Sequence, residues 1–173
     1  IETNPISLYG HQKKILETLS STFNSFSNSR LYTLRIANAY GDYFKLNRNH
    51  GLIPTLLQAS IKNKTIDIWG DGGIVKDYIH NEDISEACSK LIDYDGNEFI
   101  MNLGSGKGYS VNEIIEIINK VSKKTIKVNY LPVKNYDVNY NVLSNSLISK
   151  ELDWSPKVSI EDGIKRLYEK FII

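Results

Sequence analysis

The stretch Asn4-Pro5-Ile6-Ser7-Leu8-Tyr9-Gly10-His11-Gln12-Lys13 predicts a loop that turns into a helix. Residues four apart share one face of a helix, so the Lys13 ammonium would lie beside the Tyr9 phenol. A neighbouring cation favours phenolate, which is the form in which a tyrosine acts as a base near neutral pH. A chain with 11 tyrosines is expected to contain about one such pair by chance, so the remaining residues must decide whether this pair carries chemistry.

The composition is that of an ordinary folded domain. With 173 residues, 41% of them hydrophobic and 24% charged, the chain is long enough for one domain with a proper core. A net charge of +1 provides no general attraction to nucleic acid or to anionic lipid, so we expect neither as a partner. The sequence contains no apolar run of membrane-spanning length and no secretory signal, so we expect a cytoplasmic protein.

Two single residues add to this description. The one cysteine, Cys88, excludes an intrachain disulfide, and its neighbours Ile84, Ala87 and Leu91 predict that it is a small buried residue of a helix. The chain begins with Ile1 and enters the Tyr9 helix within about eight residues, so we expect a fragment of a longer protein.

Helical and strand patterns alternate along the chain. Apolar residues at helical spacing predict helices over 9–26, 52–62, 84–92, 111–121, 146–152 and 160–171. Runs of β-branched and aromatic residues predict strands over 31–37, 98–103 and 127–131. Ser110 with Glu113, and Ser159 with Asp162, have the pattern of a capping box, which predicts where two of these helices begin.

Two further stretches are less regular. Residues 38–51 are polar and ill-suited to a core, so we expect a long loop, entered at Asn38, that acts as a lid or a binding segment. Residues 65–83 contain two short alternating runs around Gly70-Asp71-Gly72-Gly73, which predicts a pair of strands joined by a tight turn.

The glycine loop Gly104-Ser105-Gly106-Lys107-Gly108 lies between a predicted strand and a predicted helix, as phosphate-binding loops do. Its spacing matches neither G-x-G-x-x-G nor G-x-x-x-x-G-K-[ST]. We therefore interpret these glycines as allowing a tight turn and close helix packing.

Other kinds of site have little support. His11, His50 and His80 are scattered and no cluster has ligand spacing, so we expect no metal site. We interpret Asp77 as the end of a strand and Asp83 as part of the first turn of a helix. The helix dipole favours a carboxylate at the position of Asp83.

Six stretches in a fixed order carry a resemblance to a known family. They are PISLYGHQK (5–13), RIANAYG (35–41), GLIPTLLQASIKNKTIDIWGDGGIVKDYIHNED (51–83), NLGSGKGYSVNEII (102–115), LPVKNYDV (131–138) and LDWSPKVSIEDGI (152–164). From end to end the chain resembles the C-terminal half of the NAD-dependent nucleotide-sugar epimerases and dehydratases, which are extended short-chain dehydrogenases. It looks closest to the UDP-glucose 4-epimerases.

The resemblance implies an α/β fold. It consists of the C-terminal part of a doubly wound NAD(P)-binding Rossmann domain and a smaller mixed α/β substrate-binding lobe. Residues 1–50 would complete the Rossmann sheet, and residues 51–173 would mainly form the nucleotide-sugar lobe. The strand at 98–103 would return to the main sheet.

The resemblance also assigns catalytic and cofactor residues. Tyr9 matches the family's catalytic tyrosine, and Lys13 matches its partner lysine, which also binds the nicotinamide ribose of NAD. Ile36 and Ala37 match the positions where the family's backbone passes the nicotinamide. No residue of this chain matches a metal ligand.

The substrate-binding residues implied by the resemblance are Asn38, Ile53, Ile68, Gly70, Lys76, Lys134 and Asp137. Asn38 would contact the sugar nucleotide, while residues 51–54 and 66–70 would wall the nucleotide pocket. Asp137 matches an acid that binds a ribose hydroxyl.

Lys76 and Lys134 match two positions that are usually arginine and that contact the diphosphate and the ribose. Lysine keeps the positive charge but cannot form the bidentate fork that arginine forms on phosphate. We therefore expect looser or differently aligned substrate binding.

For the full-length protein the resemblance implies an NAD-dependent UDP-hexose 4-epimerase that interconverts UDP-glucose and UDP-galactose through a 4-keto intermediate. It also implies a homodimer, because relatives pair through the Tyr9 helix. The family's first half, with its glycine-rich turn for the NAD pyrophosphate, has no counterpart in these residues. We therefore expect a missing N-terminal Rossmann half, without which this segment is inactive.

Two alternatives remain open from the sequence. A nucleotide-sugar 4,6-dehydratase or a decarboxylase of the same family also begins by oxidation at C4. A non-catalytic nucleotide-sugar-binding fragment would keep the pocket and have no turnover.

Overall fold

The computed structural model describes residues 3–41, 51–133 and 138–172. Its helices are α1 (Leu8–Phe26), α2 (Leu52–Lys62), α3 (Asn81–Ile92), α4 (Val111–Ser122), α5 (Ser146–Leu152) and α6 (Ile160–Ile172). Its strands are β1 (Thr33–Ile36), β2 (Asn38–Tyr40), β3 (Thr65–Trp69), β4 (Val75–His80), β5 (Ile100–Leu103), β6 (Gly108–Ser110), β7 (Lys127–Leu131) and β8 (Tyr140–Asn141).

The strands pair mostly with partners that are distant in the sequence. β1 pairs with β5 in parallel, with Ile36 opposite Leu103. β4 pairs in parallel with β2 and with β8, and antiparallel with β6. β3 pairs in parallel with β7, so that Trp69 lies opposite Leu131.

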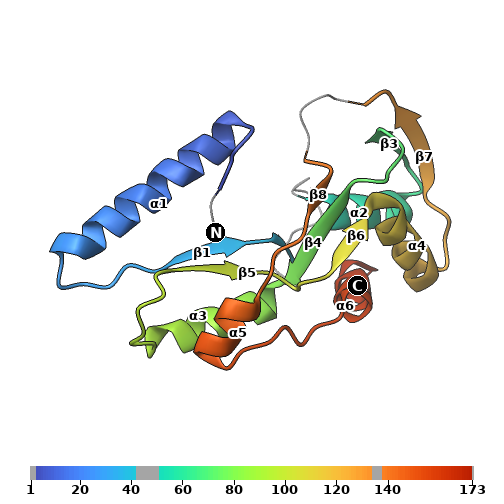
Figure 1. The fold of residues 1–173 in the computed structure, drawn as a ribbon. Helices are drawn as coiled ribbons and strands as arrows, with labels where there is room; N and C mark the ends of the chain where they lie inside the picture. The colour runs from blue at the N-terminus through green and yellow to red at the C-terminus, as the bar shows by residue number, and fades with distance from the viewer. Residues whose placement is uncertain (1–2, 42–50, 134–137, 173) are drawn as a thin grey trace.

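Two hydrophobic clusters hold these elements together. In one, α3 and α5 pack below the β1–β5 pair, as Figure 1 shows, around Met101, Leu103, Ile148 and Trp154. In the other, α2, α4 and α6 pack together around buried residues that include Leu56, Ile114 and Ile164. We placed a domain boundary at residue 50 from the sequence, and this division stays a prediction.

The helix α1 lies on the opposite side of the β1–β5 pair from α3 and α5 (Figure 1). Ser7 caps its first turn by accepting a hydrogen bond from the Gly10 amide. None of the residues 8–26 is buried, and its apolar stripe is exposed at Ile15, Leu16, Leu19, Phe23 and Phe26. The predicted homodimer through this stripe stays a prediction.

A bidentate ion pair joins α1 to the strand beneath it. Arg35 of β1 donates from Nε and from Nη2 to the two carboxylate oxygens of Glu17, each at 2.7 Å. This pairing orients the face of α1 that also carries Tyr9 and Lys13, because residues four and eight apart share a helix face.

Most of the predicted elements are confirmed. The bounds of α2, α5 and β7 are those expected, and the capping box of Ser110 and Glu113 is formed at the start of α4. At α6 the Ser159 hydroxyl accepts a hydrogen bond from the Asp162 amide, as the second cap predicts.

The predicted strand pair over 65–83 is wrong in its pairing. Both strands exist, but β3 pairs with β7 and β4 pairs with β2, β6 and β8. The Gly-Asp-Gly-Gly segment therefore links two separate sheets. Local alternation predicted the strands correctly and could not show that their partners are far away in the sequence.

Three further predictions are wrong: where a loop begins, the burial of Cys88 and the end of a strand at Asp77. Residues 38–40 form β2, so the predicted loop does not begin at Asn38, and Tyr40 is buried against the edge of His80. Residues 42–50 of the predicted loop lie outside the described residues. Cys88 is exposed, because it lies on the outer face of α3. Asp77 lies within β4 and is buried, whereas we interpreted it as a strand end.

Candidate active site

The start of α1 positions Tyr9 and Lys13 one turn apart. The Lys13 Nζ lies 5.3 Å from the centroid of the Tyr9 ring, so the ammonium sits over the aromatic face. The Tyr9 side chain is 68% exposed, which leaves it accessible to a ligand. Gly10 allows the tight entry into this helix, because a Cβ there would lie 2.9 Å from the Cβ of Pro5.

Tyr9 opens onto a pocket of about 420 Å³, here called the tyrosine pocket. Its lining residues are Tyr9, Arg35, Ile36, Ala37, Asn38, Asn141 and Leu143. The end of β1 supplies one wall, and the Ala37 amide donates to the Leu103 carbonyl to hold that wall against β5. Asn38 donates from Nδ2 to the Asp77 carbonyl at 2.9 Å, which fixes the orientation of its amide.

Arg35 lines the tyrosine pocket, and its guanidinium is ion-paired with Glu17 through Nε and Nη2. The same contact holds the pKa of the Glu17 carboxyl below its usual range, mainly through the hydrogen bonds from Arg35. The Arg35 side chain therefore acts on the shape of this pocket by anchoring α1.

A second pocket, here called the lysine pocket, adjoins the first and shares Asn38 with it. Its volume is about 440 Å³, and Lys76 of β4 lies in its wall. The Lys76 Nζ donates to the Val138 carbonyl at 2.5 Å. Ile53 and Ile68 line the pocket as buried core residues, so they shape its floor.

Tyr78 also lines the lysine pocket. Burial raises the pKa of Tyr78 to about 12, so the phenol stays protonated at neutral pH. Tyr78 is therefore a poor base at neutral pH.

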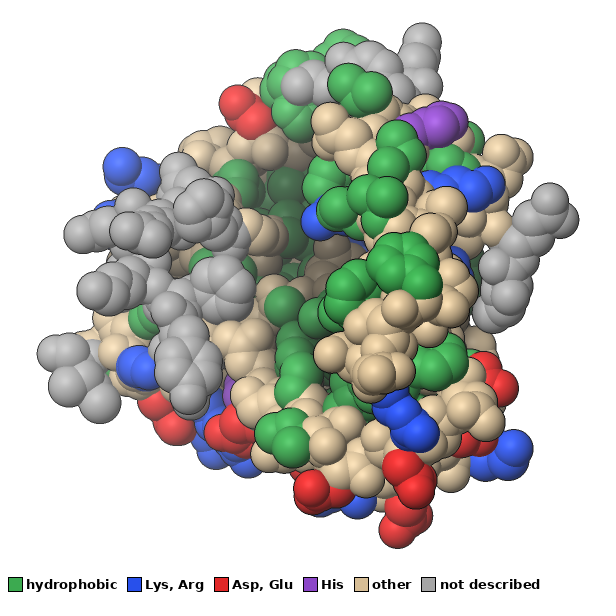
Figure 2. Space-filling model, turned by 90° about the vertical axis from the view of Figure 1, so that its left-hand side faces the viewer, with side chains coloured by type: hydrophobic (Ala, Val, Ile, Leu, Met, Phe, Trp, Pro, Cys, Tyr) green, Lys and Arg blue, Asp and Glu red, His purple; other side chains and the backbone are tan. Residues whose placement is uncertain are grey.

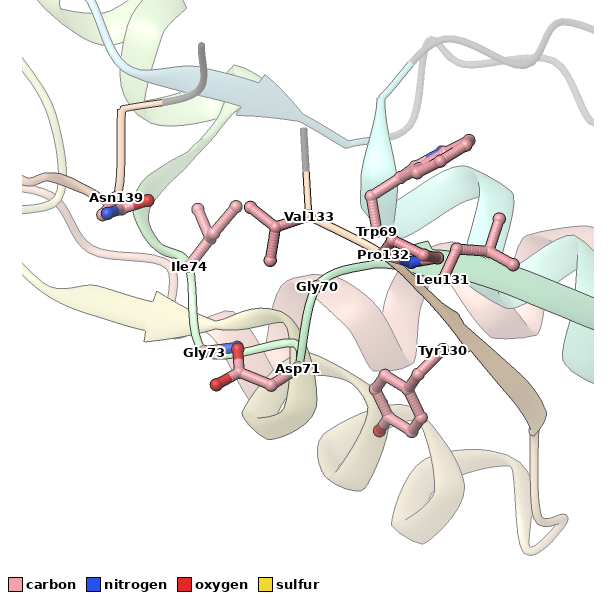
Figure 3. Close-up of a pocket in the computed structure, with 10 residues that line it drawn as sticks. All are labelled: Trp69, Gly70, Asp71, Gly73, Ile74, Tyr130, Leu131, Pro132, Val133 and Asn139. Carbon is pink, nitrogen blue, oxygen red and sulfur yellow. The ribbon is translucent and has the colours of Figure 1, made fainter. Parts of the chain in front are cut away.

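A third pocket, here called the tryptophan pocket, lies at the far end and shares Trp69 and Ile74 with the lysine pocket. Its volume is about 960 Å³ (Figure 3). In Figure 3 the side chains of Ile74 and Val133 point toward one another, and Trp69 stands up from the end of β3. Tyr130 points the other way, where its hydroxyl donates to Asn112 Oδ1 on α4.

Gly70 lies at the turn after Trp69 and lines the tryptophan pocket. Its φ of 83° is in the left-handed region, which favours glycine. The Gly70 amide donates to the Leu131 carbonyl, so this turn is tied to the end of β7.

The three pockets follow one another along a single face of the molecule. Asn38 joins the first to the second, and Trp69 with Ile74 joins the second to the third. Figure 2 shows one face of the molecule hollowed at its centre, with hydrophobic side chains lining the hollow. The arrangement provides a tyrosine at one end, a lysine in the middle and an aromatic ring at the other end.

The structure groups most residues that the sequence assigned to the site. Tyr9, Ile36, Ala37 and Asn38 line the tyrosine pocket, and Lys13 lies over the Tyr9 ring. Ile53, Ile68 and Lys76 line the lysine pocket, and Gly70 lines the tryptophan pocket. Lys134 and Asp137 lie outside the described residues.

Some lining residues were missed by the sequence interpretation. Asn141 and Leu143 join the tyrosine pocket because β8 pairs with β4, which places Asn141 opposite Lys76. No local pattern marks a two-residue strand so far along the chain. Trp69 was covered only by the range 66–70, although an aromatic residue before Gly-Asp-Gly is visible in the sequence.

Within the described ranges, no group of three His, Cys, Asp or Glu residues is arranged to hold a metal ion. The same ranges contain no helix that is long and apolar enough to cross a membrane.

Curated proteins of known name match nearly the whole chain. The chain is 33% identical to the UDP-glucuronate 4-epimerase of Thermodesulfobacterium geofontis, over 94% of this chain and 49% of that protein. It is 31% identical to the dTDP-4-dehydro-6-deoxyglucose reductase of Escherichia coli, over 92% of this chain and 50% of that protein. The chain thus spans about half the length of the curated relatives it matches.

Solved structures share the fold. The UDP-glucose 4-epimerase of Thermotoga maritima, solved with UDP-glucose, matches with a TM-score of 0.91 and 28% identity, over 98% of this chain and 54% of that one. The Thermus thermophilus UDP-glucose 4-epimerase, solved with NAD, matches with a TM-score of 0.88 and 25% identity, over 98% and 55% of the two chains. The predicted α/β class, with part of a Rossmann-type sheet, is confirmed.

The model of the NAD dependent epimerase/dehydratase family matches residues 1–104, which include α1, the Asn38 strand and Lys76. The family predicted from the six motifs is thereby confirmed, and so is NAD as its cofactor. The chain belongs to the NAD-dependent epimerase/dehydratase family.

Proposed function

We propose that this chain is the substrate-binding and catalytic-tyrosine half of an NAD-dependent nucleotide-sugar 4-epimerase of the UDP-glucose/UDP-galactose type. The observation that carries the proposal is the succession of three pockets that starts at Tyr9. A nucleotide sugar also has three parts in a row, which are a hexose, a diphosphate and a nucleoside that ends in the base.

Each pocket suits one part of that ligand. The hexose would lie in the tyrosine pocket beside Asn38 and Asn141, whose amides bind hydroxyl groups. The diphosphate would lie beside Lys76, whose ammonium offers a positive charge. The base would lie in the apolar tryptophan pocket, where a half-exposed indole offers a stacking surface.

Tyr9 would act as the base at the hexose end. Its phenolate takes the proton of the 4-hydroxyl. The phenol returns a proton to the oxygen at C4 after the 4-keto sugar has rotated to present its opposite face. Lys13 places its ammonium over the ring of Tyr9, with Nζ 5.3 Å from the ring centroid. Asn38 orients the sugar nucleotide, because its own amide is held by the Asp77 carbonyl.

The residues around Tyr9 fit one end of NAD. Ile36 is an exposed apolar side chain at the end of β1, beside Tyr9, and offers a surface for a flat ring. Tyr9, Lys13, Ile36 and Ala37 would hold the nicotinamide end. NAD supplies the hydride acceptor and donor for C4 when it is bound.

The remainder of the NAD site would come from a Rossmann half outside these 173 residues. The chain has no G-x-G-x-x-G turn to receive the pyrophosphate. The loop that looks most like one, 104–108, donates its Ser105 and Gly106 amides to the chain's own Asp77.

A second candidate reaction is suggested by the relatives, which differ in what they do at the sugar. One match is a reductase of a 4-dehydro-6-deoxy sugar, and another is a 4-epimerase. Both names place the chemistry at C4, which is where Tyr9 would act.

Liquid chromatography with mass spectrometry of the product from UDP-glucose and NAD distinguishes these reactions in the full-length protein. An epimerase gives a product of unchanged mass that co-elutes with UDP-galactose. A dehydratase gives a product lighter by one water, and a reductase acts only on a keto sugar. The proposal expects the first result, and loss of water from UDP-glucose would refute it.

A further inference from the structure

Asp77 is buried and hydrogen-bonded to Asn38 and Leu143, two residues that line the tyrosine pocket. Its residue is 1% exposed, and it occupies the third position of β4. Among the described residues, the Asp77 carboxylate accepts four hydrogen bonds. Ser105 donates to Oδ1 from its amide at 2.9 Å and from its hydroxyl at 2.6 Å. Gly106 and Leu143 donate to Oδ2 from their amides, at 3.1 and 3.3 Å.

These four donors come from two separate segments. Ser105 and Gly106 belong to the glycine loop after β5, and Leu143 follows β8. The packing is tight enough to require a glycine, because a Cβ on Gly104 would lie 2.4 Å from Asp77 Oδ2. The glycine loop thus wraps a carboxylate of its own chain.

The backbone of Asp77 reaches a third segment. Its carbonyl accepts the hydrogen bond from Asn38 Nδ2. Asn38 and Leu143 both line the tyrosine pocket, and so does Asn141, which pairs with the neighbouring Lys76. Figure 1 shows β4 running between β6 and β8, where it can hold both sides.

We propose that Asp77 is a positioning residue, which fixes the Asn141–Leu143 wall of the tyrosine pocket at the distance from Tyr9 that a bound hexose needs. It touches no ligand itself. It acts through the Leu143 amide, the Asn38 amide and the glycine loop, and a displaced wall would misplace the sugar against Tyr9. This inference rests on the proposed function.

Asp83 provides a matched control. It is equally buried, at 2% exposed, and its carboxylate accepts the amides of Lys157 and Val158 at 2.9 and 3.2 Å. It lies in the first turn of α3, and it lines none of the three pockets. Asp83→Asn should therefore disturb stability as Asp77→Asn does, without moving the tyrosine pocket.

Hydrogen–deuterium exchange tests the clamp without any ligand. An asparagine keeps the size of the side chain but turns an NH2 group toward the N–H donors. We expect Asp77→Asn to speed exchange about tenfold or more within 104–106 and 139–143, and Asp83→Asn to do so at Lys157 and Val158. Unchanged exchange in both Asp77 segments would overturn the proposal.

Calorimetry with UDP-glucose tests the consequence, at a temperature where all variants are folded. We expect Asp77→Asn to raise the Kd about 10- to 100-fold and Asp83→Asn to leave it within about twofold. An equal loss of UDP-glucose affinity in both variants would mean that Asp77 contributes only to the stability of the fold, and it would refute the positioning role. If the unsubstituted protein does not bind UDP-glucose, the proposed function fails, while the exchange data still decide on the clamp.

Ser105→Ala covers the case in which Asp77→Asn does not fold. It removes the hydroxyl that donates to Asp77 Oδ1 and accepts from the Lys107 amide at 3.2 Å, and it leaves the carboxylate and the three amides. The same two segments should exchange faster and the Kd should rise about threefold. No change in either measurement would overturn the proposal.

Discussion

The Nζ of Lys13 lies 5.3 Å from the centroid of the Tyr9 ring, at the edge of a pocket that Asn38 and Asn141 also line. Tyr9 and Lys13, which are four residues apart in the sequence, therefore lie at one end of a series of pockets. The opposite end carries Trp69, and Lys76 lies between them.

The tryptophan pocket predicts a loss of UDP affinity in Trp69→Ala. Stacking of a base on an aromatic side chain contributes about 1–3 kcal/mol, so the Kd for UDP should rise about tenfold or more. Trp69→Phe should lose less, because it keeps an aromatic face. Tyr168→Phe is the control, since its hydroxyl donates to the Ser122 carbonyl and Tyr168 lines none of the three pockets. Calorimetry that gives equal Kd values for Trp69→Ala and the unsubstituted protein would place the base elsewhere.

The lysine pocket predicts tighter UDP binding in Lys76→Arg. Arginine can form two parallel hydrogen bonds with a diphosphate, so the Kd should fall about threefold or more. Lys64→Arg, which changes an exposed lysine just before β3, should leave the Kd unchanged. An unchanged or higher Kd for Lys76→Arg would argue against contact between this residue and phosphate.

The Glu17–Arg35 ion pair predicts a pH-dependent anchoring of α1. Arg35 holds the pKa of Glu17 below its usual value near 4.5, so the stabilisation is present above about pH 4.5 and is lost as the pH falls through the lowered pKa. Glu17→Gln should lower the free energy of unfolding by about 1 kcal/mol at pH 7, and the difference should shrink at pH 3.

Urea unfolding at the two pH values measures this difference. Glu86→Gln is the control, because Glu86 pairs with the exposed Lys157 on the surface. This substitution should lower the free energy of unfolding by less than Glu17→Gln does. A Glu17→Gln protein that is as stable as the unsubstituted protein at pH 7 would contradict the role of this ion pair.

The sequence predicted the elements of the fold better than their partners. Proline in a first turn and the Ser110–Glu113 box marked the helices α2 and α4, because these are local signals. The pairing of β3 with β7 joins Asp67 to Asn129, and no local signal spans that separation. The predicted strand pair over 65–83 failed for this reason.

The candidate site was predictable to the extent that its residues belong to motifs. Tyr9, Asn38 and Lys76 lie in stretches that carry the family resemblance, and each lines a pocket. Asn141 enters the tyrosine pocket only through the pairing of β8 with β4. Asp77 could be taken for a strand end, because burial of a carboxylate depends on donors that lie about 30 and 66 residues away.

Turnover of UDP-glucose by Tyr9→Phe in the full-length protein tests the central claim most directly. Tyr140→Phe is its control, since both tyrosines are 68% exposed and only Tyr9 lies beside Lys13. We predict that Tyr9→Phe lowers the rate of UDP-galactose formation about 10²- to 10⁴-fold, keeps the Kd for UDP-glucose within about twofold, and that Tyr140→Phe changes the rate little. A Tyr9→Phe protein that forms UDP-galactose at the unsubstituted rate would contradict the account.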